Sequence, residues 1–322
     1  MAKIKVGVFR GGPSSEYDIS LRTGAEVLKA LDGTRYEALD ILVDKAGVWH
    51  LHGTPKEPHK ICNLIDVAFN ALHGEYGEDG KIQQIFERFG VPYTGSGIAA
   101  SAASMHKRTM RDVLGQAGFL LPPGIAVMRD SNWADASAYA IRHLGFPLII
   151  KPASRGSSIG VRTASNAYEA LGAMAHAFKS DNEILIERRI PGREATGAVL
   201  ERFRGIRHYA FPVIEIVPPA GRPFFDTACK YDGSAEEFCP GRFSDEIRDR
   251  IQRASMDAHT ALGCRHYSRS DFIVTPKNEV YILELNTLPG LTDQSLFPKA
   301  AASIGLEFPQ FVHHVLSLAL HR

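Results

Sequence analysis

The sequence has few cysteines and none of the cysteine patterns that mark disulfide-rich or zinc-binding proteins. The four cysteines among 322 residues form no C-x-x-C pair, and none stands at metal-ligand spacing from a pair of histidines. We therefore expect thiols in a reducing compartment rather than disulfides. The four are Cys62, Cys229, Cys239 and Cys264.

Long hydrophobic runs are also missing. No apolar run approaches the ~18 residues that a membrane-spanning helix needs. The apolar stretch near the N-terminus is too short for the core of a signal peptide and runs into a glycine turn, so we interpret it as a first strand. These absences predict a cytoplasmic protein with no membrane partner.

An excess of charge of one sign is absent as well. Lys and Arg number 37 and Asp and Glu number 36, which leaves a net charge of +1. Such a balance gives no overall field toward nucleic acid. Hydrophobic residues (44%) and charged residues (23%) occur in the proportions of a globular protein, which excludes disordered, collagen-like and coiled-coil chains. The length predicts about two domains or three small ones.

The N-terminal part of the chain alternates between strand and helix patterns. This alternation predicts α/β architecture, with a doubly wound parallel sheet up to about residue 95. In such sheets ligands bind beyond the carboxyl ends of the strands, which points to the loops Gly11–Glu16 and His73–Gly80. The expected strands are Ile4–Phe9, Ala38–Val43 and Val67–Leu72, and the expected helices span Leu21–Leu31 and Ile82–Phe89.

The pattern changes after a predicted helix at Met105–Ala117 and a linker at Gly118–Gly124. From about residue 191 long strands dominate, which predicts α+β architecture rather than a continuation of the first sheet. The segment Gly221–Cys239 has too few apolar residues for a strand or helix and predicts, for the most part, a mobile loop. The expected strands are Leu148–Lys151, Ile159–Thr163, Glu183–Ile190, Glu194–Glu201, Arg207–Val217, Arg269–Val274 and Val280–Asn286, with helices at Ala136–Leu144, Asn166–Phe178, Ile247–Ala258 and Phe311–Leu316.

Two carboxylates near the C-terminus are the most informative feature. A hairpin turn centred between Lys277 and Asn278 would pair Asp271 with Glu284, and Arg269 with Asn286. Paired carboxylates repel unless a cation or proton lies between them, and hard oxygen ligands suit Mg²⁺ shared with phosphate. The alternative is a salt-bridged strand pair on a solvated face.

A lysine before a Gly/Ser-rich loop, Lys151 to Gly160, is a second feature. Backbone N–H groups, hydroxyls and the ammonium group of such a loop can hold phosphate oxygens, although the Walker A order is absent. A flexible surface hairpin is the alternative. Lys107 could supply another phosphate cation, or be a surface lysine.

Three further segments leave their alternatives open. The turn from Glu187 to Glu194 could bind the edge of an adenine and a ribose, or could merely connect two strands. Glu16 follows two glycines at a strand-to-helix turn that lacks G-x-G-x-x-G, so a nicotinamide cofactor fits poorly, and Glu16 could be a helix cap. His73 could likewise belong to a binding site or be a structural histidine.

Taken together and in order, these segments resemble the D-alanine:D-alanine ligases, members of the ATP-grasp superfamily, over nearly the full chain. The resemblance implies a two-subdomain ATP-grasp fold after the N-terminal sheet, with domains at residues 1–104, 105–190 and 191–322. The segments that carry it are Gly11–Glu16, Leu72–Gly80, Pro92–Gly97, Ser104–Lys107, Lys151–Gly160, Lys230-Tyr231, Arg269–Asp271, Glu284–Gly290 and Ser295-Leu296.

The resemblance also implies a reaction. A first D-alanine carboxylate attacks the γ-phosphorus of ATP, and the amine of a second D-alanine displaces phosphate from the acyl phosphate. The product serves peptidoglycan precursor synthesis. Two Mg²⁺ ions, for which Mn²⁺ can substitute, and a homodimer are implied as well.

Residue roles follow from the same resemblance. The catalytic group is Glu16 and Ser157, which join Tyr231 in closing the site, with Arg269 and Ser295. The substrate group is His73, Lys230, Tyr231, Gly290 and Leu296; the ATP group is Lys107, Lys151, Glu187, Ile190 and Glu194; and the metal group is Asp271, Glu284 and Asn286.

In the resembling family, a tyrosine at the position of Tyr231 accompanies dipeptide ligases, and phenylalanine accompanies D-lactate ligases, so D-alanyl-D-alanine is the expected product. Two alternatives remain. One is another ATP-grasp carboxylate–amine ligase with different amino acid substrates. The other is a non-catalytic nucleotide-binding relative.

Overall fold

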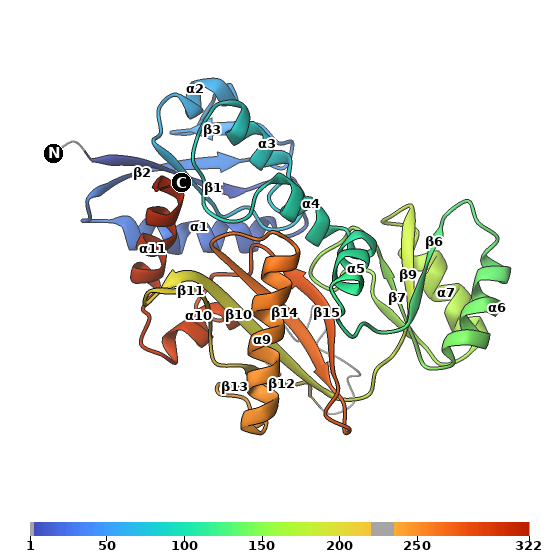
Figure 1. The fold of residues 1–322 in the computed structure, drawn as a ribbon. Helices are drawn as coiled ribbons and strands as arrows, with labels where there is room; N and C mark the ends of the chain where they lie inside the picture. Colours follow the sequence, from blue (N-terminus) through green and yellow to red (C-terminus); the bar gives the residue numbers. More distant parts are fainter. Residues whose placement is uncertain (1–2, 220–234, 322) are drawn as a thin grey trace.

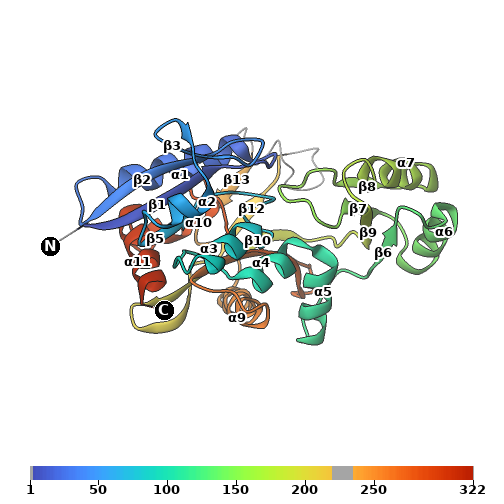
Figure 2. The ribbon, with the colours of Figure 1, turned by 90° about the horizontal axis from the view of Figure 1, so that it is seen from above.

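The computed structural model describes residues 3–219 and 235–321, which form three β-sheets with their helices (Figure 1). The first sheet and the third lie together, while the second sheet, with helices α6 and α7, projects at one end (Figure 2). The mixed α/β and α+β architecture expected from the sequence is confirmed.

The first sheet has the strand order β4-β3-β2-β1-β5. Strands β2, β1 and β5 are parallel, and apolar side chains pack on both faces, as the alternating pattern predicted. Two short antiparallel strands, β3 and β4, extend one edge and were not expected. The elements are β1 (Ile4–Gly11), α1 (Tyr17–Leu31), β2 (Tyr36–Val43), β3 (Trp49–Leu51), β4 (Thr54–Pro55), α2 (Pro58–Cys62), β5 (Val67–Asn70), α3 (Lys81–Arg88) and α4 (Ile98–Met105).

The second sheet is antiparallel, with the order β6-β9-β7-β8. The strand expected at Ile159–Thr163 begins later, because turns occupy the loop before it and Ser157 and Ser158 have positive φ. The elements, including the preceding α5, are α5 (Lys107–Gln116), β6 (Gly124–Met128), α6 (Trp133–Leu144), β7 (Leu148–Pro152), β8 (Arg162–Ala164), α7 (Ala167–Ala177) and β9 (Glu183–Arg188).

The third sheet has the order β13-β12-β10-β14-β15, and β11 also pairs with β10. The single strand expected at Arg207–Val217 is two strands, interrupted around Pro212, which has no N–H to donate. The prediction of no strand in Gly221–Cys239 was wrong at β13, and residues 220–234 lie outside the described part. The elements are β10 (Arg193–Phe203), β11 (Ile206–Ala210), β12 (Ile214–Val217), β13 (Glu236–Phe238), α9 (Asp245–Ala261), β14 (Tyr267–Val274), β15 (Val280–Asn286), α10 (Leu296–Ala302) and α11 (Phe308–Leu320).

The C-terminal helix joins the third sheet to the first. Helix α11 packs against α1 and β5, so its apolar residues enter the core that lines one face of the first sheet. Val312, Val315 and Leu316 are fully buried there. The chain therefore returns to its beginning, and the loops of the first and third sheets come together.

Three of the cysteines fall in the described residues, and all three are free thiols. Burial raises the pKa of Cys62 to about 11 and that of Cys264 to about 12. Both thiols are therefore protonated at neutral pH. Among the described residues no helix is both long enough and apolar enough to cross a membrane.

Candidate active site

Two adjoining cavities bring most of the predicted site residues together. We call the first the inter-sheet cavity, because residues of the second and third sheets line it. We call the second the loop cavity, because its walls come from loops that follow strands of all three sheets. Lys107 and Glu284 line both cavities, so the two spaces meet at these side chains.

The inter-sheet cavity contains all five residues predicted to bind ATP. Its apolar walls include Ile149, Val161 and Phe272. At its polar end are Asp271 and Glu284 of the third sheet. The five residues are Lys107, Lys151, Glu187, Ile190 and Glu194.

A buried carboxylate organises the lysine of this cavity. Glu187 is 3% exposed, and its two oxygens contact Lys151 Nζ at 2.7 Å and Arg111 Nη1 at 2.6 Å. Arg111 also donates to the carbonyl oxygen of Pro122. The ammonium group of Lys151 is thus fixed at the cavity wall. Sequence reasoning missed Arg111, which lies on α5 and carries no local signal for a contact with β9.

The paired carboxylates lie where the sequence predicted them. Asp271 pairs with Glu284, and Arg269 with Asn286, across β14 and β15. The turn, however, is one-half residue away from its predicted centre: Val274 pairs with Val280, which centres the turn on Lys277. A β-bulge that leaves Leu283 without an opposite residue then restores the predicted pairing.

Arg269 neutralises one of these carboxylates. Its Nε and Nη2 donate to the two oxygens of Asp271 at 3.0 and 2.9 Å, and Thr196 Oγ1 donates to Asp271 Oδ1 at 2.6 Å. Burial alone would lower the pKa of Arg269, but Asp271 and Glu284 raise it, so the guanidinium group stays charged. The site therefore holds a fixed positive group beside two acidic ones.

The metal-ligand group fits a hard divalent cation. Asp271 and Glu284 face each other across the strands and offer carboxylate oxygens to the inter-sheet cavity. Asn286 Oδ1 accepts from the N–H of Leu288 at 2.8 Å, which leaves one of its lone pairs for another partner. Carboxylate and amide oxygens are the donors that Mg²⁺ prefers.

The loop cavity contains the described residues of the catalytic and substrate groups. Ser157 and the adjacent Gly156 come from the Gly/Ser loop, and a Cβ at Gly156 would lie 3.2 Å from Glu16 Oε2. A larger residue at position 156 would require the Glu16 carboxylate to shift by a few tenths of an ångström. Lys230 and Tyr231 lie outside the described residues. The predicted residues that line the cavity are Glu16, His73, Ser157, Arg269, Gly290, Ser295 and Leu296, together with Glu284 and Asn286.

His73 connects the first and third sheets. It is 3% exposed; its Nδ1 lies 3.1 Å from the carbonyl oxygen of Leu288, and its Nε2 lies 2.8 Å from Thr23 Oγ1. A carbonyl can only accept, so Nδ1 carries the proton and Nε2 accepts from Thr23. His73 therefore holds the loop after β15 against the first sheet.

Glu78 is a site residue that sequence reasoning missed. It lines the loop cavity, its Oε1 accepts from the N–H of Gly74 at 2.7 Å, and its charge contributes to the raised pKa of Arg269. The run from His73 to Gly80 contained it, but only the three-dimensional structure brings it near Arg269. Gly290 and Ser295 also approach closely, since a Cβ at Gly290 would lie 2.8 Å from Ser295 Oγ.

Comparisons with known proteins agree on one family. A family model described as D-ala D-ala ligase C-terminus matches residues 113–317, and one described as D-ala D-ala ligase N-terminus matches residues 5–63 and 52–96. The D-alanine–D-alanine ligase of Geotalea uraniireducens is 41% identical over 98% of this chain and 95% of its own length. Ligase A of Salmonella typhimurium is 32% identical over 100% of this chain and 97% of its own length.

Solved structures give the same result. The VanG D-Ala:D-Ser ligase from Enterococcus faecalis matches with a TM-score of 0.86 and 31% identity, over 98% of this chain and 99% of that one. The D-alanine–D-alanine ligase from Bacillus anthracis, complexed with ATP, matches with a TM-score of 0.81 and 31% identity, over 99% and 98%.

Proposed function

The chain belongs to the D-alanine–D-alanine ligase family, and we propose that it joins two D-alanines at the two cavities described above. As a member of that family it is an ATP-dependent ligase that acts on small molecules, and its product serves peptidoglycan precursor synthesis. The observation that carries the assignment to these cavities is the junction of Lys107 and Glu284 between them, with Asp271 opposite Glu284.

ATP occupies the inter-sheet cavity in this proposal. Its base lies between the apolar walls near Ile190, and Glu194 accepts from the ribose hydroxyls. Lys107 and Lys151 hold the phosphates, with Lys151 oriented by Glu187. Phosphoryl transfer depends mainly on positioning and charge neutralisation, which this arrangement supplies.

The amino acids occupy the loop cavity. Glu16 holds the ammonium group of the first D-alanine, with Ser157 beside it, and His73 and Leu296 form part of the wall. Arg269 and the backbone of Gly290 stabilise the oxyanions that develop as the acyl phosphate forms and is attacked. Ser295 holds the carboxylate of the second D-alanine.

Asp271, Glu284 and Asn286 hold divalent cations in the proposal, two Mg²⁺ in number, with Mn²⁺ able to replace them. When bound, these ions neutralise phosphate charge. Arg269 keeps the charge of Asp271 balanced and its oxygens in place. In the proposal, these side chains therefore fix the position of the phosphate end of ATP.

Several assignments extend the proposal. The functional units are residues 1–104, 105–190 and 191–322, and the protein is a cytoplasmic homodimer. The acceptor is D-alanine rather than D-lactate, because a tyrosine occupies position 231. The relative named as a D-Ala:D-Ser ligase makes this acceptor choice the first point to test.

The test is ADP release by the full chain with ATP, Mg²⁺ and D-alanine, D-serine, D-lactate or L-alanine. We expect turnover with D-alanine, little with L-alanine, and D-alanyl-D-alanine as the product by mass spectrometry. Equal turnover with another amino acid pair would assign a different carboxylate–amine ligase. ATP binding without ADP formation would assign a non-catalytic relative.

A matched pair of variants tests the site. Asp271→Asn should lower kcat by roughly 100-fold, a magnitude typical of losing one transition-state electrostatic group. Asp257→Asn is the control, because Asp257 is exposed on α9 and lines neither cavity. Equal activity of the two variants would contradict the assignment of Asp271.

A further inference from the structure

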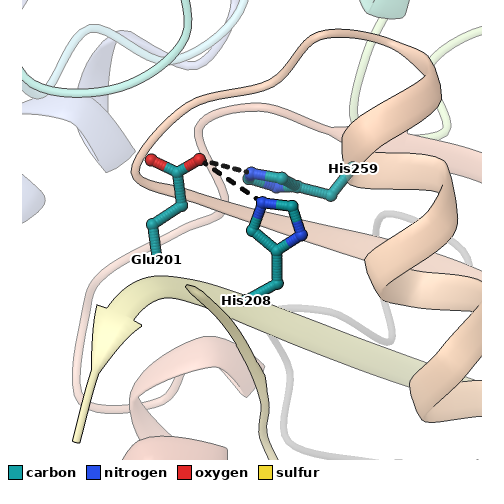
Figure 3. Close-up of side chains that lie close together, drawn as sticks. All are labelled: Glu201, His208 and His259. Atoms are coloured by element: carbon teal, nitrogen blue, oxygen red, sulfur yellow. Dashed lines mark hydrogen bonds and ion pairs between the residues drawn. The ribbon is translucent and has the colours of Figure 1, made fainter. Parts of the chain in front are cut away.

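Three metal-ligating side chains meet on the third sheet, outside both cavities. Glu201 lies on β10, His208 on β11, and His259 on α9 (Figure 3). The register explains the first pair, because Glu201 and His208 are directly opposite each other in the antiparallel ladder. Helix α9 packs over β10 and β11, which brings His259 onto the same carboxylate. None of the three lines the inter-sheet or loop cavity.

The ligand atoms converge on a common point. His259 Nε2 is 3.5 Å and His208 Nε2 is 3.8 Å from Glu201 Oε1, and the three ligand atoms lie within 4.8 Å of one another. Tetrahedral ligands bound at the usual zinc distances are about 3.3 Å apart. Small side-chain movements therefore bring all three into a metal's first coordination sphere.

The outer nitrogens of both histidines already have the partners that metal-binding histidines use. His259 Nδ1 lies 2.7 Å from Ser268 Oγ, and His208 Nδ1 lies 3.3 Å from Thr260 Oγ1. Thr260 donates its own proton to the carbonyl oxygen of Met256, so it must accept from His208. That assignment puts the proton of a neutral His208 on Nδ1 and turns the lone pair of Nε2 toward Glu201.

A lone pair aimed at a carboxylate is unfavourable unless a cation or a proton lies between them. The other carboxylate oxygen, Glu201 Oε2, accepts from the N–H of His266 at 2.8 Å, so the carboxylate is held in place with Oε1 facing the two histidines. Imidazole nitrogens beside a carboxylate oxygen form a donor set that transition metals such as zinc accept.

Access and neighbouring charge complete the description of the cluster. The side chains of His208 and Glu201 are 17% and 22% exposed, whereas that of His259 is 1% exposed. An ion can thus reach the cluster from solvent and keep one position open to water. The positive charges near it are Arg202 and Arg207, and the further histidines are His266 and His314.

We propose that Glu201, His208 and His259 bind one divalent transition-metal ion, with Zn²⁺ as the best match, and that this ion fastens the β10–β11 hairpin to helix α9. Two imidazoles and a carboxylate favour Zn²⁺ over Mg²⁺, which prefers oxygen donors and an octahedral shell. The site is therefore distinct in chemistry from the paired carboxylates of β14 and β15.

The experiment measures Zn²⁺ binding to the full chain, purified without a histidine tag and treated with chelator, in excess Mg²⁺ and ADP. We expect one Zn²⁺ per chain by calorimetry, a raised melting temperature, and a tetrahedral visible spectrum when Co²⁺ replaces Zn²⁺. His208→Gln should weaken Zn²⁺ affinity at least roughly 10-fold, the lower end of what a lost supporting contact costs a metal site. His208 is the residue of choice because the burial of His259 makes its variants prone to misfolding.

His50→Gln is the matched control. His50 lies 2.9 Å from Asp44, so it is also a histidine paired with a carboxylate, but it belongs to no group of three ligands in the described residues. It should bind Zn²⁺ as the unaltered chain does. Equal affinity of the His208→Gln variant and the unaltered chain, or no Zn²⁺ bound by the unaltered chain, would overturn the proposal and reduce the cluster to an ion-paired network.

Discussion

A single guanidinium group offsets the acidic side chains that gather near the junction of the two cavities. Arg269 spans both oxygens of Asp271, while Glu284 lies opposite and Glu78 is close enough to add to the raised pKa of Arg269. Without Arg269, the three carboxylates would lie near the proposed triphosphate site with one positive group fewer to offset them. The planar fork holds Asp271 in one orientation, which a point charge cannot do.

Arg269→Lys tests this geometry. The lysine keeps the charge but cannot donate to both oxygens of Asp271, so we expect kcat to fall by roughly 100-fold or more with a smaller change in KM for ATP. Steady-state kinetics and a melting curve separate a lost function from a lost fold. Arg253→Lys on the exposed side of α9 is the control. A kcat for Arg269→Lys close to that of the control would show that charge alone is enough.

Residues differ in how far sequence could place them. The pairing of Asp271 with Glu284 was predictable, because strand alternation and a short turn restrict the register. It held only because the Leu283 bulge offset a turn centred on Lys277. Glu78 and Arg111 could not be placed, since their partners are distant in sequence and no periodicity connects them.

At the scale of elements, a buried carboxylate fastens β12 to its surroundings. Glu215 on β12 is 2% exposed and accepts from Arg193 on β10 and from Arg242, which follows β13. The two arginines also stack on Phe243 and Phe238, with guanidinium-to-ring distances of 4.2 and 3.5 Å. These contacts secure the edge of the third sheet next to the inter-sheet cavity.

In the Glu215→Gln variant, the free energy of unfolding should depend less on pH in the acid range. Burial alone would raise the pKa of Glu215, but hydrogen bonds from Arg242 and Arg193 lower it below its ordinary value of 4.5. Its contribution is therefore present above that ordinary value and is lost as pH falls through the lower pKa of the folded state. Because the arginines are half exposed, we expect a cost of about 1 kcal/mol at neutral pH.

Denaturant unfolding at about pH 7 and at about pH 3.5 measures the effect. The difference in free energy of unfolding between the unaltered chain and the Glu215→Gln variant should be smaller at the lower pH. Glu26→Gln on the exposed side of α1 is the control and should change little at either pH. If this difference in free energy of unfolding is larger in acid, the folded state favours the protonated carboxyl group, which contradicts the prediction.

Elements with a strong period were predicted well, and short paired strands were not. The amphipathic helices α9 and α11, the buried strand β1 and the half-buried strand β15 follow directly from residue spacing. Strand β13 has three residues and depends on β12 for its hydrogen bonds, so no local pattern reveals it. The break near Pro212 is the reverse case, where the missing N–H was a local signal within an apolar run.

At the scale of the whole molecule, the Gly/Ser loop spans from the second sheet to the first. Arg155 in this loop forms an ion pair with Glu75, which follows β5, and its Nε donates to the carbonyl oxygen of Ser180. The carbonyl oxygen of Arg155 in turn accepts from Lys107 Nζ. The position of the loop over the junction of the two cavities is therefore linked to the first sheet.

Glu75→Gln should weaken the attachment of the Gly/Ser loop to the first sheet. Water should then reach the acyl phosphate more often. A partly exposed ion pair contributes ~0.2–1 kcal/mol, so the open loop should become roughly 1.4 to 5 times more populated. We expect more than one ADP per dipeptide, because water competes with the second D-alanine for the acyl phosphate. Glu57→Gln, at an exposed helix end with no side-chain cap hydrogen bond, should keep the ratio of the unaltered chain. Arg155→Ala combined with Glu75→Gln should raise the ratio no further than Arg155→Ala alone, whereas independent, additive effects or an unchanged ratio would mean that this ion pair does not hold the loop closed.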